Sequence, residues 1–162
     1  FVATSVYGLP YDDETFDFAI QNGVFHHLND EDKAIKEVTR ILRRGGYFWF
    51  YNNGEGAIKA DLLNTAVEIL KDVSEEYIVG LMKNMNIKEQ KINYLTDGFK
   101  AVYAFTTYDE LTEKLAGFGY GNFKRMVGGF STDFDHDCIA ADPYGKEKYG
   151  EGNLRILAQK IN

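Results

Sequence analysis

Two adjacent histidines, His26 and His27, are the residues of this sequence best suited to proton transfer. They follow a short apolar run at residues 16–21. An imidazole titrates near neutral pH, so either ring could take a proton from a hydroxyl or an amine. Adjacent residues cannot share one face, so we expect His26, in preference to His27, to face a substrate. The alternative is that one histidine caps the following helix and packs structurally.

Three aspartates with alternate spacing form a second candidate site. In an extended segment Asp133, Asp135 and Asp137 would share one side, where their carboxylates could hold a hard cation. The glycine turn of a calcium-binding loop is missing from this stretch. We therefore interpret it as a solvated acidic turn or a lip of the active site, and we expect no bound metal.

Two glycine clusters resemble phosphate loops but lack the required context. Gly54-Glu55-Gly56 lies between a strand and a helix, yet the third glycine of the dinucleotide-binding pattern is missing, which makes it a weak candidate. The cluster at residues 117–121 follows a helix and precedes a strand, the reverse of the order that directs helix amides at a phosphate. We interpret the second cluster as a helix stop followed by turns.

The elements that must position these residues begin with a strand, a helix and a strand. The apolar run 16–21 predicts a buried strand. Helical spacing from Asn29 to Arg44, with acids at the start and Arg43-Arg44 at the end, predicts a helix that Gly45 stops. The aromatic run Tyr47–Tyr51 predicts a second buried strand. A unit of this length suits a right-handed parallel crossover, typical of α/β proteins.

The remainder of the chain adds helices and then further strands. Residues 57–97 contain no proline and show helical apolar stripes. Thr107–Glu110 forms a capping box that opens another helix. Strand patterns follow at 123–127 and 154–159, separated by a turn-rich stretch from Asp142 to Gly152.

Composition excludes several classes of protein. The chain has 162 residues, with 18 Lys and Arg against 25 Asp and Glu, so its net charge of −7 is unsuited to coating nucleic acid. No apolar run approaches the roughly 18 residues of a membrane span. The single cysteine, Cys138, cannot form an internal disulfide. That usage fits a reducing compartment, so we expect a cytoplasmic protein with one core.

Five motifs, taken in order, resemble the class I S-adenosylmethionine-dependent methyltransferases. They are Phe1–Tyr11, Phe16–Ile20, Val24–Leu28, Ala34–Glu37 and Arg40–Gly46. The resemblance is closest to the small-molecule branch related to quinone-biosynthesis enzymes. It covers residues 1–53 closely and 107–127 and 153–160 more loosely, and it covers 57–105 only as a variable helical insertion.

The resemblance implies an α/β fold with a Rossmann-like sheet of seven strands that ends in an antiparallel hairpin. This chain would start at the third family strand, so that residues 1–162 form an amino-terminally truncated domain without the first Gly-rich turn. The insertion at 57–105 would cover the acceptor site. We expect the chain to be inactive alone, as a fragment of the enzyme.

The resemblance also assigns site residues, with S-adenosylmethionine as the cofactor and a small molecule as the acceptor. Ser5 and Val6 would meet the adenine, with Ser5 standing where the family commonly has an acid. Gln21 and Asn22 would approach the methionine part of the cofactor. The catalytic candidates His26, His27 and Asn52 would lie beside the acceptor. An amide such as Asn52 cannot be a strong base, which places that role on His26.

A non-catalytic role is the alternative. The chain could be a fragment or pseudoenzyme subunit that keeps the sheet as an interaction surface. The resemblance also implies an open, apolar sheet edge around Ile20, because the family's first two strands would lie beside it. This edge could pair with another copy of the chain or with another protein.

Overall fold

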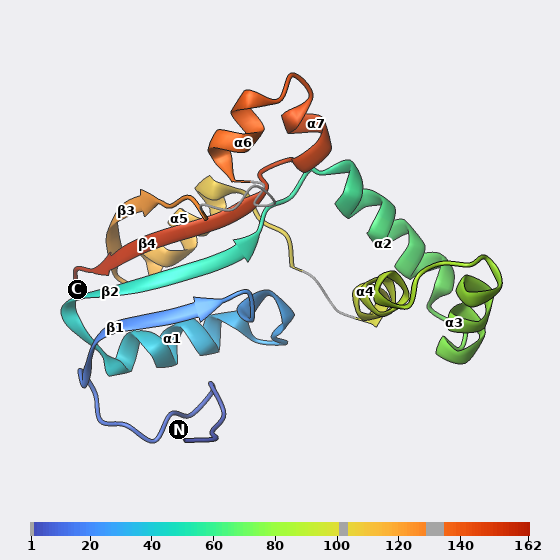
Figure 1. The fold of residues 1–162 in the computed structure, drawn as a ribbon. Helices are drawn as coiled ribbons and strands as arrows, with labels where there is room; N and C mark the ends of the chain where they lie inside the picture. The colour runs from blue at the N-terminus through green and yellow to red at the C-terminus, as the bar shows by residue number, and fades with distance from the viewer. Residues whose placement is uncertain (1, 101–103, 129–134) are drawn as a thin grey trace. The chain divides into compact units, whose positions relative to one another are not determined.

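A four-stranded sheet organises the larger part of the protein (Figure 1). The computed structural model describes residues 2–100, 104–128 and 135–162. Strand order is β1-β2-β4-β3, with β1 and β2 parallel and β4 antiparallel to both β2 and β3. The strands are β1 (Phe16–Asn22), β2 (Leu42–Asn53), β3 (Tyr120–Arg125) and β4 (Asn153–Lys160). The predicted α/β class and the terminal antiparallel pair are confirmed.

The first helix, α1 (Glu31–Ile41), connects β1 to β2. It starts where the Asp30 side chain accepts the Lys33 N–H at 3.0 Å. The prediction that it runs to Arg44 is wrong, because β2 already begins at Leu42, which is buried and pairs with Phe16. Lys160 of β4 caps the helix end instead, donating from Nζ to the carbonyls of Thr39 at 3.1 Å and Leu42 at 2.8 Å.

One face of the sheet is covered by α1 and by α5 (Tyr108–Gly117), which pack into a single core. The predicted capping box opens α5, since Thr107 and Glu110 hydrogen-bond each other's backbone. Leu111 and Leu115 of α5 are buried, as predicted. Alternate residues of the central strands meet the two helices: Phe48, Phe50, Leu154, Ile156 and Ala158.

The opposite face and the β1 edge remain open in the described residues. Phe18 is 49% exposed, Ile20 66% and Tyr47 41%, and the register places Phe18 beside Tyr47. The predicted open edge at Ile20 is therefore present. The expected opening strand is not, because residues 2–5 belong to no strand. A strand needs a neighbour to accept its hydrogen bonds, and the sheet offers these residues none.

Residues 58–102 belong to a second compact unit, separate from the sheet. Its helices are α2 (Ile58–Leu70), α3 (Glu75–Asn84) and α4 (Glu89–Lys100). Met82 and Ile92 are buried within it, while Leu62 and Tyr77 are each 66% exposed.

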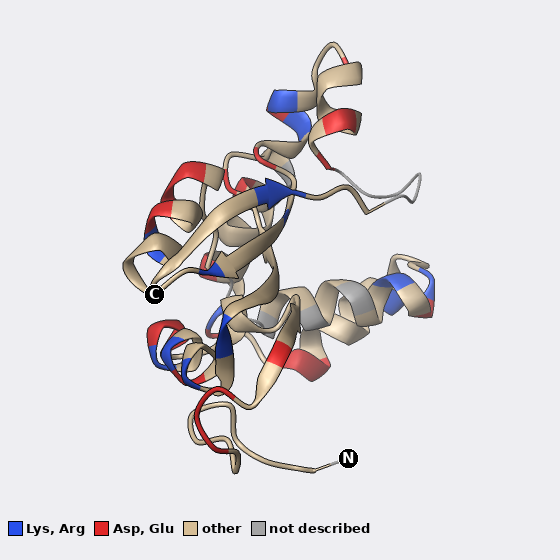
Figure 2. Ribbon diagram, turned by 90° about the vertical axis from the view of Figure 1, so that its left-hand side faces the viewer, with Lys and Arg blue, Asp and Glu red and all other residues tan. Residues whose placement is uncertain are grey.

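The stretch predicted as turns contains α7 (Gly145–Tyr149), and α6 (His136–Ala141) comes directly before it. Asp135 accepts the Cys138 N–H at 3.2 Å and so caps α6. Acidic and basic residues are interspersed along the helices (Figure 2). None of the described helices is long and apolar enough to cross a membrane.

Candidate functional site

The parallel strands β1 and β2 end at the same edge of the sheet, where open α/β sheets bind their ligands. The short helix η1 (Phe25–His27) follows β1 at this edge and carries both histidines. Backbone contacts fix it there, because the Ala104 N–H donates to the His26 carbonyl at 3.1 Å. The segment after β2 is held by a bridge between Gly54 and Thr106.

His26 is buried, with 4% of its surface exposed, and lies among amide side chains. Its Nε2 lies 3.2 Å from Asn53 Nδ2. Burial, and secondarily the charge of His27, lower the pKa of His26 from 6.5 to about 4, although a hydrogen bond with the Asn52 side chain opposes this shift. The ring is therefore uncharged at neutral pH and keeps a lone pair to accept a hydrogen bond.

The other predicted catalytic residues occupy different surroundings. His27 is exposed, with its ring centroid 4.0 Å from that of His26. Asn52 is only 2% exposed and lies on the covered face of β2, where its Nδ2 donates to Glu31 Oε1 at 3.4 Å. Asn53, which the sequence did not single out, is the amide beside His26 Nε2.

The Gln21 side chain restrains the end of β1 through two hydrogen bonds to the main chain. Its Nε2 donates to the Tyr51 carbonyl at 2.7 Å, and its Oε1 accepts the Val24 N–H at 2.9 Å. The side chain is thus engaged, so a cofactor contact from Gln21 would come from its main chain. Asn22 is exposed at the strand end. Gly23 follows with φ +68°, and a Cβ there would lie 3.0 Å from the Tyr51 ring and 3.8 Å from His26.

The two residues predicted to contact adenine, Ser5 and Val6, lie in the loop before β1. Hydrogen bonds attach this loop to α1, whereas the two histidines follow β1. Ser5 is exposed, and its Oγ accepts the Tyr7 N–H at 3.3 Å. Val6 is half-buried and packs against the core. The predicted residues thus fall in two places: Ser5 and Val6 on the loop, and the others at the strand ends.

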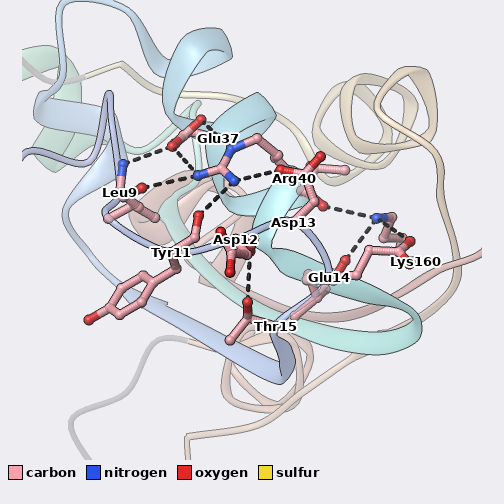
Figure 3. A network of polar contacts seen from close by, with 11 residues as sticks. Leu9, Tyr11, Asp12, Asp13, Glu14, Thr15, Glu37, Arg40 and Lys160 are labelled. Carbon is pink, nitrogen blue, oxygen red and sulfur yellow. Dashed lines mark hydrogen bonds and ion pairs between the residues drawn. The ribbon is translucent and has the colours of Figure 1, made fainter.

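Arg40 holds the loop that follows Ser5 and Val6 (Figure 3). Its guanidinium donates to the carbonyls of Leu9 at 3.1 Å and Tyr11 at 2.8 Å, and it pairs with Asp13 at 2.6 Å. Glu37 completes the network, accepting from Arg40 at 2.8 Å and from the Leu9 N–H at 2.7 Å. These hydrogen bonds, Arg40 first, lower the pKa of Glu37 to about 2. The three-residue spacing of Glu37 and Arg40 was the available sequence signal.

The three aspartates predicted to share one side, Asp133, Asp135 and Asp137, do not form one site in the described residues. Asp135 caps α6, and Asp137 lies 3.5 Å from His136. Asp133 is outside the described residues. Within the ranges that the structure describes, no group of three or more His, Cys, Asp or Glu side chains could hold a metal ion.

Comparisons with known proteins agree with this architecture. Residues 1–50 match the methyltransferase domain family. A phthiotriol/phenolphthiotriol dimycocerosates methyltransferase of Mycobacterium tuberculosis is 33% identical over 52% of this chain and 33% of its own. The mitochondrial 2-methoxy-6-polyprenyl-1,4-benzoquinol methylase of Leishmania donovani is 26% identical over 76% of this chain and 40% of its own.

A solved structure gives the same fold. A SAM-dependent methyltransferase of Thermotoga maritima superposes with a TM-score of 0.57 at 24% identity, covering 97% of this chain and 62% of that one. The chain spans less than two thirds of the length of these relatives. The family match over residues 1–50, the named relatives and the shared fold together support a class I S-adenosylmethionine-dependent methyltransferase.

Proposed function

We propose that the protein transfers a methyl group from S-adenosylmethionine to a small-molecule acceptor at the edge where β1 and β2 end. The observation that carries this proposal is His26, a buried and uncharged imidazole beside Asn53 at that edge. Methyl transfer needs an aligned lone pair on the acceptor more than a strong acid or base. A neutral hydrogen-bonding ring in a fixed position meets that need.

The residues at the end of β1 fit the donor. Gly23 leaves room that a Cβ would fill against the Tyr51 ring and His26, which permits close approach of a ligand to the backbone. Oxygen atoms of Gln21 and Asn22 suit the ammonium and sulfonium charges of the cofactor. Ser5 and Val6 are assigned to the adenine, where a serine hydroxyl binds more weakly than a carboxylate would.

S-adenosylmethionine, when bound, supplies an electrophilic methyl group whose bonding electrons leave with sulfur. The chain's own part is to bind and orient the acceptor. We assign His26 Nε2 to accept a hydrogen bond from the acceptor's O–H or N–H in place of Asn53. A ring with a pKa of about 4 holds a full proton weakly, so orientation is its main contribution and the proton departs to water.

The choice of acceptor is assigned to the helical insertion. The relatives named above act, by their names, on a phthiotriol and on a polyprenyl benzoquinol. We assign residues 57–105 to acceptor choice, since segments added beyond the strand ends commonly carry specificity on a shared scaffold.

The test is methyl transfer by the purified protein, with radiolabelled S-adenosylmethionine and a panel of small phenols, quinols and amines. Changing His26→Ala should lower kcat by about tenfold or more and leave cofactor affinity nearly unchanged. His136→Ala is the matched control, because His136 is an exposed histidine of α6. Unchanged turnover in the His26→Ala variant would show that His26 has only a structural role.

A further inference from the structure

The second compact unit, residues 58–102, contains a cavity of about 240 Å³. In this unit α4 packs against both α2 and α3 (Figure 1). The residues that line the cavity come from these three helices and from the turn between α2 and α3: Val67, Leu70, Val73, Ile78, Thr96 and Phe99. The cavity therefore belongs to this unit alone.

The cavity continues the face of α2 that packs against α4. A Cβ at Gly98 of α4 would lie 3.2 Å from Leu63 Cδ1 of α2, so the glycine permits a close contact between the two helices. Val67 and Leu70 follow Leu63 by four and seven residues, so they share its side of the helix. On α4 the residue after Gly98 is Phe99, which lines the cavity.

The lining of the cavity is apolar apart from its rim. Thr96 is 8% exposed, and its hydroxyl donates to the Ile92 carbonyl at 2.8 Å, so its hydrogen is already used within α4. The charged residues that border the cavity, Lys71 and Glu75, are both exposed. A molecule that matches this lining is a hydrocarbon, because a charged or strongly polar group would lose its water without gaining a partner.

The unit that holds the cavity buries few of its own apolar side chains. Among its described residues Met82 and Ile92 are buried, whereas Leu62, Ile69 and Tyr77 are 66%, 70% and 66% exposed. Helices of 13, 10 and 12 residues are marginal by themselves in water and depend on apolar packing. A hydrocarbon in the cavity would add such packing between all three helices.

The volume of the cavity sets the size of the ligand. A water molecule, which is similar in size to a methylene group, takes up about 30 Å³ in the liquid, so 240 Å³ corresponds to about eight such groups. An engineered apolar cavity of about 150 Å³ is already large enough to bind benzene. We propose that the cavity between α2, α3 and α4 is a binding site for a hydrocarbon chain of about eight carbon atoms.

Such a chain has two sources. One is an apolar substituent of the methyl acceptor, and this source rests on the proposed function, in which residues 57–105 choose the acceptor. The other is a free lipid. Binding of the chain itself needs neither cofactor nor methyl transfer, so it can be measured separately.

The experiment is a titration of the unmodified protein with straight-chain alcohols of four to twelve carbons, followed by the methyl signals of ¹³C-labelled Ile, Leu and Val. We expect saturable binding of one 1-octanol per chain, with the largest shifts at Val67, Leu70 and Ile78. Affinity should rise about fourfold with each carbon and level off at about eight carbons, where the cavity is filled. Affinity that keeps rising to twelve carbons, or shifts largest at the exposed Leu62 and Leu81, would overturn the proposal.

Two phenylalanine variants of α2 test the position of the site. Val67→Phe should occupy part of the cavity and weaken 1-octanol binding by about tenfold or more. Ile69→Phe is the matched control, because Ile69 is 70% exposed and lies outside the lining, and its binding should stay within about twofold. Equal binding by the two folded variants would contradict the proposal. The chain-length series needs no variant and decides the question even where Val67→Phe does not fold.

Methyl transfer to phenol and to 4-octylphenol distinguishes the two sources of the chain. An acceptor substituent predicts that Val67→Phe raises the KM for octylphenol about tenfold more than the KM for phenol. Equal changes in the two KM values, together with weakened octanol binding, support the site and assign it to a free lipid. Absence of octanol binding in a protein that methylates phenol would overturn this proposal and leave the proposed function in place. Octanol binding without any methyl transfer would do the reverse.

Discussion

The burial of His26 predicts that the protein loses stability in mild acid. The pKa of the ring falls from 6.5 to about 4 on folding, chiefly through burial and then through His27. Because the folded state binds the proton less well than the unfolded chain, protonation favours unfolding. The uncharged His26 ring therefore makes its full contribution to the free energy of unfolding above pH 6.5. This contribution is lost as the pH falls from 6.5 towards 4.

The size of this loss of stability follows from the difference between the two pKa values of His26. One pKa unit corresponds to about 1.4 kcal/mol, so the change from 6.5 to about 4 sets an upper limit of about 3–4 kcal/mol. The neighbouring His27 is exposed, and water reaching this side of the ring screens part of the effect. We expect a loss of about 2 kcal/mol, a substantial share of the stability of an ordinary domain.

The assay is urea unfolding between about pH 7.5 and 4.5, followed by fluorescence of Trp49, the single tryptophan, which lies on β2 of the sheet unit. Carboxylates also titrate in this range, so the measured quantity is the difference between the unmodified protein and His26→Gln. That difference should change by about 2 kcal/mol across the range, in favour of the variant at low pH. His136→Gln should follow the unmodified protein. A difference independent of pH would refute the reasoning.

Two other predictions concern the loop and the insertion. Arg40→Met should release the loop that it fastens to α1, so that amide exchange at Leu9 becomes about tenfold faster, whereas Lys36→Met leaves it unchanged. Exchanging residues 57–105 for a relative's insertion should change which acceptor is methylated; a folded hybrid with the original acceptor would contradict this.

The strand–helix–strand unit was predictable because its signals are local. Apolar and aromatic runs mark the residues of β1 and β2, and the acids at the start of α1 mark its beginning. The prediction that β1 is buried is wrong, because it lies at the edge of the described sheet and leaves Phe18 and Ile20 exposed. The end of α1 was not predictable in this way. Arg43 and Arg44 suit the end of a helix, but Leu42 pairs with Phe16 and is buried, so tertiary pairing starts the strand three residues earlier than Gly45 suggests.

The candidate site was only partly predictable for a similar reason. A histidine after a strand is visible in the sequence, and His26 was preferred to its neighbour because two adjacent residues cannot share one face. The choice between Asn52 and Asn53 depends on which face of β2 each occupies. The Glu31 contact to Asn52 joins residues 21 apart, and the Lys114 contact to Glu31 joins residues 83 apart. Such contacts exist only once α1 and α5 are packed on the sheet.

The position of β1 at the sheet edge explains how Gln21 serves the site. Among the described strands β1 pairs only with β2, so backbone pairing restrains it from one side. Gln21 adds a side-chain restraint at its end, bonding the Tyr51 carbonyl and the Val24 N–H. Because that clamp sets where β1 stops, it also sets where Gly23 turns and where η1 presents His26. The Gln21 side chain can therefore control the position of His26 through hydrogen bonds within the protein.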